Sequence, residues 1–272
     1  MNQRVQIAQL PHGVAHVTLV REDKLNAIDP DMLTALNAAI AELQVKPGLR
    51  AIVLSGQGRA FCAGYDFASF KRMRDAAQPG GDANYRDVTT RTHGLTNAAQ
   101  HAFWGWHELP VPVIAAVHGV AFGAGLQLAL AADIRLATAD AQMSVMEIKW
   151  GLVPDLSGLV RFRRLVRDDV ARELTYTGRI VRADEAQGLG LVTRVCADPL
   201  ADALTLAAQI GQKNPGGIRA GKRLLNASES FDVSTGAMLL AESAEQQALI
   251  GTPNQAEAVQ ANLEQRAPVF QD

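Results

Sequence analysis

Two glycine-rich segments of this sequence can bring backbone N–H groups close to a ligand. One is GRAFCAGYD at residues 58–66, directly after an apolar run, and the other is AAVHGVAFGAGLQ at residues 115–127. Glycine lets the main chain approach a ligand, and a glycine turn leading into a helix exposes N–H groups where the helix dipole stabilises negative charge. Two such donors from separate loops are what a thioester enolate needs. The competing interpretation of the first segment is a tight connection between a strand and a helix.

Neither segment has the spacing of a nucleotide-binding motif. The glycines of the second segment fall at Gly119, Gly123 and Gly125, which is not the GxGxxG pattern of dinucleotide-binding proteins. Residues 216–223 have the GxxxxGK spacing of a phosphate-binding loop, but Arg223 stands where Ser or Thr would hold magnesium. No strand precedes them either. The dinucleotide interpretation is therefore weak, and the phosphate-loop interpretation is rejected.

Strands and helices alternate around these segments. Residues 13–20 and 50–55 are the β-branched runs typical of strands. Between them, Asp29 is the expected N-cap of a helix that begins at Pro30 and stops at residues 47–48. The pattern returns as a strand, a helix and a strand at residues 113–117, 124–132 and 133–137. This order predicts an α/β fold.

The pattern changes to helices after residue 197. Asp198, Asn214 and Thr252 each precede a proline, a combination that starts helices. The sequence therefore predicts an α/β core over residues 1–197 and three or four helices over residues 198–272. A surface turn is expected at residues 79–82, PGGD.

Composition argues against several classes of function. Lys and Arg number 26 against 28 Asp and Glu, and the resulting net charge of −2 gives no electrostatic basis for binding nucleic acid. With 48% hydrophobic and 20% charged residues, the chain can bury a core and is typical of neither disordered nor membrane proteins. Cys62 and Cys196 form no metal or disulfide pattern, so we expect no metal site and a reducing compartment. Without a targeting or membrane-spanning pattern, a cytoplasmic location is expected.

Taken together, the two segments resemble the crotonase (enoyl-CoA hydratase/isomerase) superfamily. The resemblance extends to LNAID at residues 25–29, to VMEIKWGLVPD around Glu147, to TGRIVRADEAQGLGLVTRV at residues 177–195 and to the helical tail. It implies a spiral of ββα units with a C-terminal helical trimerisation region, assembled as a homotrimer or a dimer of trimers. It also implies an acyl-CoA thioester substrate, with coenzyme A entering as part of the substrate and no separate cofactor.

The resemblance also implies roles for individual residues. By position, the oxyanion hole consists of the backbone N–H groups of Tyr65 and Ala124. The CoA and substrate-binding positions would be Lys24, Leu25, Ala63, Gly64, Asp66 and Gly123.

Three polar side chains decide which reaction the resemblance implies. Enoyl-CoA hydratases of this family carry two glutamates that hold and activate water, but here the first is Gln127 and only the second, Glu147, is an acid. An amide cannot transfer a proton, although it can orient water or substrate by hydrogen bonds. Asp155 stands where the dienoyl-CoA isomerases place an acid; those isomerases also carry an acid at position 127. Chlorobenzoyl-CoA dehalogenases use an Asp at position 155 as nucleophile, but they lack the acid at position 147.

Several of these residues have other interpretations. Glu147 could be a surface glutamate, and Asp155 could cap a helix that starts near Ser157. Cys62 is expected to be a small buried residue. For four histidines we expect a place in the core or the acyl pocket rather than at a metal: His93, His101, His107 and His118.

The sequence thus predicts an acyl-CoA enzyme that stabilises a thioester enolate, with Glu147 as acid and base and Asp155 as second proton carrier or polar anchor. Double-bond isomerisation is favoured, because it needs one competent base. Burial near an apolar acyl tunnel is expected to raise the pKa of Glu147. The alternatives are hydration with Gln127 orienting water, a specialised lyase or hydrolase of aromatic or alicyclic CoA esters, and an inactive CoA-ester-binding protein. The same resemblance implies a role in fatty acid metabolism.

Overall fold

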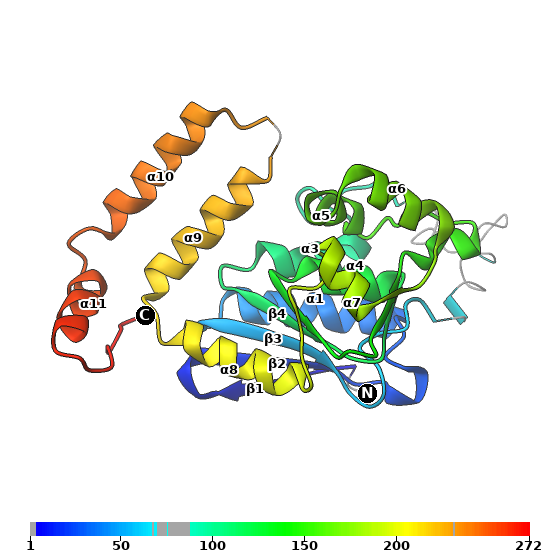
Figure 1. Cartoon of the computed structure of the whole chain (residues 1–272), viewed down its shortest axis with the longest axis horizontal. Helices are drawn as coiled ribbons and strands as arrows, with labels where there is room; N and C mark the ends of the chain where they lie inside the picture. The colour runs from blue at the N-terminus through cyan, green and yellow to red at the C-terminus, as the bar shows by residue number, and fades with distance from the viewer. Residues whose placement is uncertain (1–3, 67, 70–74, 76–87, 231) are drawn as a thin grey trace.

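A computed structural model of the chain describes residues 4–66, 68–69, 75, 88–230 and 232–272. Its α/β part contains a six-stranded sheet with helices on both faces, and further helices extend away from it toward the C-terminus (Figure 1). The turn expected at residues 79–82 lies outside the described residues.

The larger sheet has the strand order β1-β2-β3-β4-β6-β9. β1 pairs antiparallel with β2, and all other pairs are parallel. Every residue of β4 is buried, as is typical of a parallel strand covered on both faces. The strands expected near residues 13–20, 50–55, 113–117 and 133–137 are present. The strands comprise β1 (Val5–Leu10), β2 (Val14–Leu19), β3 (Ala51–Gly56), β4 (Val113–Val117), β6 (Ile134–Ala137) and β9 (Arg194–Val195).

A smaller sheet, β5-β7-β8, was not expected from the sequence. It consists of β5 (Val120–Phe122), β7 (Gln142–Ser144) and β8 (Val181–Arg182), which have at most three residues each. Strands this short show too few alternations for a sequence pattern. β5 leads into the segment that carries Gln127, and β7 leads into the segment that carries Glu147. The pairing of β5 with β7 therefore positions these two segments relative to each other.

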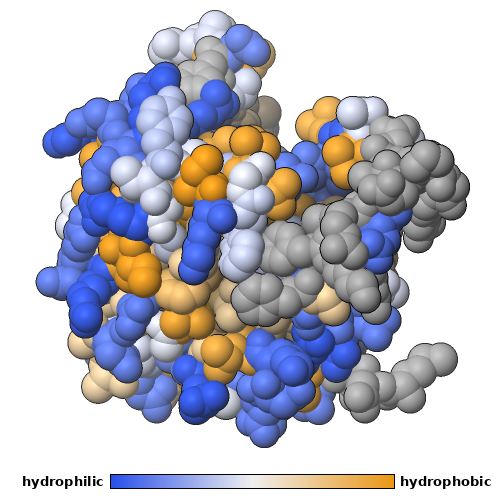
Figure 2. Space-filling model, turned by 90° about the vertical axis from the view of Figure 1, so that its right-hand side faces the viewer, coloured by the Kyte–Doolittle hydropathy of each residue, from blue (hydrophilic) through white to orange (hydrophobic). Residues whose placement is uncertain are grey.

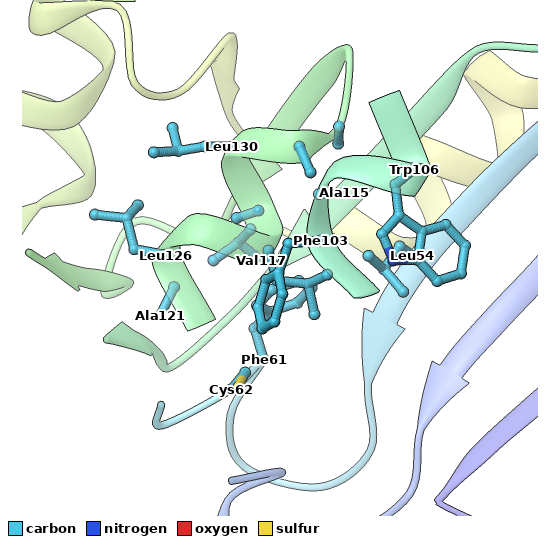
Figure 3. Packing of buried hydrophobic residues seen from close by; sticks show 14 of the residues in the cluster. Leu54, Phe61, Cys62, Phe103, Trp106, Ala115, Val117, Ala121, Leu126 and Leu130 are labelled. Carbon is cyan, nitrogen blue, oxygen red and sulfur yellow. The ribbon is translucent and has the colours of Figure 1, made fainter. Parts of the chain in front are cut away.

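Helices cover both faces of the larger sheet. On one face α1 (Pro30–Gln44), α3 (Ala98–Glu108) and α4 (Ala124–Ala131) enclose the main core. Figure 3 shows part of this core, where Phe61, Phe103 and Trp106 pack close to Leu54 and Val117. On the opposite face, α8 (Pro199–Gly211) lies across the sheet and buries Ala203 and Ala207 against it. Further short helices are α5 (Gly158–Leu165), α6 (Asp168–Thr177) and α7 (Ala183–Leu189).

The last three helices project from the α/β part (Figure 1). They are α9 (Pro215–Ser228), α10 (Thr235–Leu249) and α11 (Pro253–Leu263), and their starts follow the predicted caps Asn214 and Thr252. Every residue of α10 is exposed or half-buried, including Leu239 and Leu240. On another side of the molecule, the surface is largely hydrophilic with separate hydrophobic patches (Figure 2). Among the described residues, no helix is long and apolar enough to span a bilayer.

Candidate active site

A cavity of about 690 Å³ lies where the two glycine-rich segments meet. Ten of the predicted site residues line it: Lys24, Leu25, Ala63, Gly64, Tyr65, Asp66, Gly123, Ala124, Glu147 and Asp155. The remaining predicted residue, Gln127, is not among the described residues that line this cavity. Apolar side chains of Met146, Trp150, Leu152, Val153 and Ile180 form much of the rest of the wall. The cavity can therefore take a ligand with both polar and apolar parts.

The segment before Tyr65 is held on two sides by backbone hydrogen bonds. On one side Cys62 pairs with β5, because its N–H donates to Val120 (3.0 Å) and its carbonyl accepts from Phe122 (3.1 Å). On the other side Ile28 N–H donates to the carbonyl of Gly64 (2.7 Å). In a trans peptide the C=O and the following N–H point in opposite directions, so the Tyr65 N–H points away from Ile28. Its direction is fixed before any ligand binds.

The second donor, Ala124, is the first residue of α4. The preceding Gly123 has φ +50°, and its N–H donates to Ser144 on β7 (2.9 Å). The N–H groups of a first helical turn have no partner within the helix and lie at its positive end. Ala124 lines the cavity, so its N–H group is suited to stabilising negative charge on a ligand there.

Glycine is required for the two segments to approach each other this closely. A Cβ on Gly64, whose φ is +93°, would lie 2.7 Å from the carbonyl oxygen of Phe122 and 3.7 Å from the Ala124 nitrogen. A Cβ on Gly125 would lie 2.1 Å from the carbonyl oxygen of Cys62. Both glycines therefore allow the segments that carry Tyr65 and Ala124, which both line the cavity, to lie side by side.

A buried polar network supports the Lys24–Leu25 side of the cavity. Asn26 is fully buried with φ +55°, and its amide donates to the carbonyls of Gln57 (2.9 Å) and Ala60 (2.8 Å). Arg21 donates to the carbonyl of Ala27 (2.9 Å) and pairs with Asp66. Partial desolvation of Asp66 is outweighed by the Ala68 N–H and Arg21, so the pKa of Asp66 is lowered. Sequence reasoning missed Arg21 and Asn26; an Asn inside LNAID, where a left-handed turn is needed, was the available signal.

Glu147 lies in a short 3₁₀ helix, η4 (Met146–Trp150), and its side chain is buried. Its Oε1 accepts a hydrogen bond from Gln127 Nε2 (2.7 Å), whereas Oε2 is buried and has no hydrogen-bond partner among the described residues. Desolvation raises the pKa of the Glu147 carboxyl, and the charge of Asp155 raises it further. The surface interpretation of Glu147 is wrong, because its side chain is buried, and a carboxyl with a raised pKa is suited to both accepting and donating a proton.

Gln127 is buried on α4 and contacts Glu147, which separates it from the described lining of the cavity. Its Oε1 accepts hydrogen bonds from the N–H groups of Leu156 (2.9 Å) and Gly158 (3.0 Å). Its side chain thus connects α4 to Glu147 and to the turn that follows Asp155.

Asp155 lies on that turn, at the wall of the cavity. The interpretation of Asp155 as a helix cap is wrong, because Ser157 precedes α5 as its N-cap and makes no side-chain capping bond. The side chain keeps contact with solvent, yet the surrounding walls partly desolvate it and raise the pKa of its carboxyl. Two carboxyl groups with raised pKa values therefore line one cavity.

The remaining candidates lie elsewhere. Cys62 is fully buried, as expected, and desolvation raises the pKa of its thiol to about 12. His107 is in the core, where burial lowers its pKa to about 3. The four histidines were expected in the core or the acyl pocket; His107 is in the core, and the described lining of the cavity contains none of the four. Within the described ranges, no group of three or more His, Cys, Asp or Glu side chains could hold a metal ion.

Comparison with known proteins gives one consistent result. The family model of enoyl-CoA hydratase/isomerase matches residues 9–272. The Bacillus subtilis protein YngF, which carries an enoyl-CoA hydratase/isomerase name, is 35% identical over 262 residues, covering 94% of each chain. The mitochondrial Delta(3,5)-Delta(2,4)-dienoyl-CoA isomerase of Mus musculus is 32% identical, covering 97% of this chain and 80% of the relative. A crystal structure of an enoyl-CoA hydratase from Mycobacterium smegmatis superposes with a TM-score of 0.83 at 32% identity, covering 98% of both chains. The predicted crotonase-like α/β fold is confirmed.

Proposed function

Because this chain belongs to the enoyl-CoA hydratase/isomerase family, we propose that it moves a carbon–carbon double bond within an acyl-CoA thioester bound in the 690 Å³ cavity. The thioester carbonyl oxygen accepts hydrogen bonds from the N–H groups of Tyr65 and Ala124. Negative charge accumulates on this oxygen as the enolate forms, so both bonds strengthen in the transition state. The polar lining around Lys24 and Asp66 faces the CoA portion, and the apolar wall contacts the acyl group.

The chemistry is a proton transfer in two steps. The Glu147 carboxylate removes a proton from a carbon of the acyl chain, and the electron pair of the broken C–H bond moves through the conjugated system to the thioester oxygen. A protonated carboxyl then returns a proton to a different carbon, and the enolate collapses to the shifted double bond. Asp155, protonated before the reaction, is this second carrier, because it is the other carboxyl with a raised pKa at the cavity wall. After product formation Glu147 releases its proton to solvent and Asp155 takes one up, which restores both carboxyls for the next turnover. The net reaction consumes neither water nor cofactor.

One observation carries this proposal over hydration. The position that would hold the first catalytic glutamate of a hydratase is Gln127, whose oxygen is occupied by Leu156 and Gly158 and whose amide nitrogen donates to Glu147. A neutral side chain with these partners supplies no second acid to activate water. The dienoyl-CoA isomerase relative from Mus musculus supports the same class of reaction.

Hydration remains the second candidate, supported by the similarity to the Mycobacterium smegmatis hydratase structure. In that case the Gln127 amide would orient the water by a hydrogen bond. A specialised lyase or hydrolase of aromatic or alicyclic esters is a further alternative, whereas the enzymes among this chain's relatives argue against an inactive ester-binding protein.

The C-terminal helices support the proposal of a homotrimer or a dimer of trimers. α10 exposes Leu239 and Leu240, and Leu263 at the end of α11 is 76% exposed. Apolar surface of this extent on projecting helices is typical of a subunit interface. The cytoplasmic location stays a prediction.

The test is an assay of the purified protein with crotonyl-CoA, a 3-enoyl-CoA and a 3,5-dienoyl-CoA in heavy water, read by absorbance and mass. We expect double-bond movement with deuterium incorporation and without a gain of water. Glu147→Gln should reduce turnover by about 100-fold or more while ester binding persists. Glu42→Gln, at an exposed position on α1, is the matched control and should be fully active. Addition of water to crotonyl-CoA as the main reaction would contradict the proposal.

A further inference from the structure

The orientation of the Gln127 amide is determined by its neighbours. Backbone N–H groups only donate hydrogen bonds, so the amide atom that faces the N–H groups of Leu156 and Gly158 must be the oxygen. The NH₂ group must then face Glu147 Oε1, at 2.7 Å. A flipped amide would place a donor against two donors and an acceptor against a carboxylate.

Close packing holds the Gln127 side chain in this position. A Cβ on Gly158 would lie 2.4 Å from Gln127 Cγ, so the start of α5 rests directly on it. Gln127 is 4% exposed and lies outside the described lining of the large cavity. Its oxygen already accepts two hydrogen bonds and one of its two amide hydrogens already binds Glu147, so most of its polar groups are engaged within the protein.

We propose that Gln127 is a positioning residue, which fixes the Glu147 carboxylate and the turn carrying Asp155 relative to each other without touching the substrate. The predicted change in turnover rests on the proposed function. The hydrogen bonds of Gln127 do not depend on that proposal. One amide group holds both carboxyl-bearing segments, since the turn from Asp155 to Gly158 and η4 are both attached to the same side chain.

The amide also assigns different roles to the two oxygens of Glu147. Gln127 donates to Oε1 whether Glu147 is charged or neutral, so the titrating proton belongs on Oε2, the oxygen without a hydrogen-bond partner among the described residues. A carboxylate at position 127 could accept from Leu156 and Gly158 equally well, but it would offer Glu147 no donor and would add a like charge. The other charged residues around the cavity are Asp23, Lys24, Arg59, Asp66, Lys149 and Asp155.

Two substitutions separate these effects. Gln127→Met keeps the approximate shape and loses all three hydrogen bonds, whereas Gln127→Glu keeps the acceptor for the turn and loses the donor to Glu147. Both changes should raise the pKa of Glu147, because a hydrogen bond to its charged form is lost, so the acidic limb of the kcat–pH profile should move up by about one pH unit. We expect kcat to fall by about 100-fold in Gln127→Met with KM nearly unchanged. Gln44→Glu, at the exposed end of α1, controls for the added charge.

If Gln127 had only a structural role, kcat of its variants would fall in proportion to the loss in their melting temperature. In that case Gln127→Glu, which retains the support of the turn, would recover most of the activity with an unshifted pH profile, and the proposal would be overturned. It would also be overturned if Gln127→Glu gained water addition to crotonyl-CoA, because position 127 would then act on substrate.

A measurement without substrate keeps this inference separate from the proposed function. The ¹³C carboxyl resonance of Glu147, assigned by its loss in Glu147→Gln, can be titrated in the free protein. An upward shift of its midpoint by about one unit in both Gln127 variants, and none in Gln44→Glu, is expected. An unshifted midpoint overturns the inference. If every CoA ester fails to react while the resonance shifts as expected, the proposed function is wrong and the positioning role stands.

Discussion

Substitution of Gly64 by Ala tests whether the two glycine-rich segments form one binding site for a developing oxyanion. The new methyl carbon would lie 2.7 Å from the carbonyl oxygen of Phe122, whereas ordinary contacts of a Cβ begin near 3.4 Å. The segment carrying Tyr65 must therefore move by about 0.7 Å away from β5 and the start of α4. Its attachments to Leu25 and Ile28 on the other side oppose this movement.

The expected magnitudes follow from this displacement. Holding a non-glycine residue at φ +93° costs about 1–2 kcal/mol, and the contact adds about as much, so the free energy of unfolding should fall by about 2–4 kcal/mol. Removal of one oxyanion donor typically lowers kcat by about 100-fold to 1,000-fold. A displacement that lengthens one hydrogen bond without removing it should therefore lower kcat by about 10-fold to 100-fold, and KM should change less because these bonds strengthen in the transition state.

The assay is steady-state turnover of the best CoA ester, together with denaturant unfolding of the same preparations. Gly251→Ala is the matched control, since it has φ +76° and open space where the Cβ would lie. It should lose about 1 kcal/mol of stability and keep full activity. A Gly64→Ala protein with wild-type kcat would refute the reasoning that Tyr65 and Ala124 act together.

Three further outcomes are expected. The raised folded-state pKa of Glu147 means that its contribution to stability is complete below its unfolded pKa and is lost as the pH rises through the folded value. Glu147→Gln should accordingly gain stability relative to wild type in urea unfolding as the pH rises from the unfolded pKa through the folded one, and a stability difference that narrows over this range would contradict the assignment. Asp155→Asn should block double-bond movement while Glu147 still exchanges a substrate proton for deuterium; loss of exchange and isomerisation in equal measure would count against separate roles. Lys222 donates to Asp133 (2.9 Å) and to the carbonyl of Val111 (2.9 Å), so Lys222→Met should destabilise the protein by about 2 kcal/mol, and a change below about 0.5 kcal/mol would disprove the importance of this buried pair.

Much of the larger sheet and its helices could be predicted from local patterns. The strands β3 and β4 are continuous apolar runs, and the caps Asp29, Asn214 and Thr252 mark helix starts that depend only on neighbouring residues. The smaller sheet could not be predicted, because its strands are too short to show a period. β1 was not predicted either, because several of its residues are exposed and it lacks the apolar pattern of a buried strand.

The sequence predicted which residues line the cavity better than it predicted the hydrogen bonds between them. Glu147 and Asp155 were identified by their positions in the segments that resemble the crotonase superfamily, and both line the cavity. The hydrogen bonds of Gln127 to Leu156 and Gly158 join residues about thirty positions apart, which is a property of the folded chain alone. Arg21 was missed for the same reason, because its ion pair with Asp66 joins residues far apart in the sequence.

The position of α8 on the far face of the larger sheet has a consequence for biosynthesis. Apolar residues of four central strands, among them Val14, Val53, Ile114 and Leu136, are buried on the side that Ala203 and Ala207 of α8 complete. During translation, the strands up to β9 leave the ribosome before this helix does, so a nascent chain exposes one apolar side of a nearly finished sheet. Such a surface attracts chaperones and other nascent chains until residues 199–211 emerge. A nascent chain whose strands have left the ribosome while residues 199–211 are still inside it is therefore expected to be prone to aggregation.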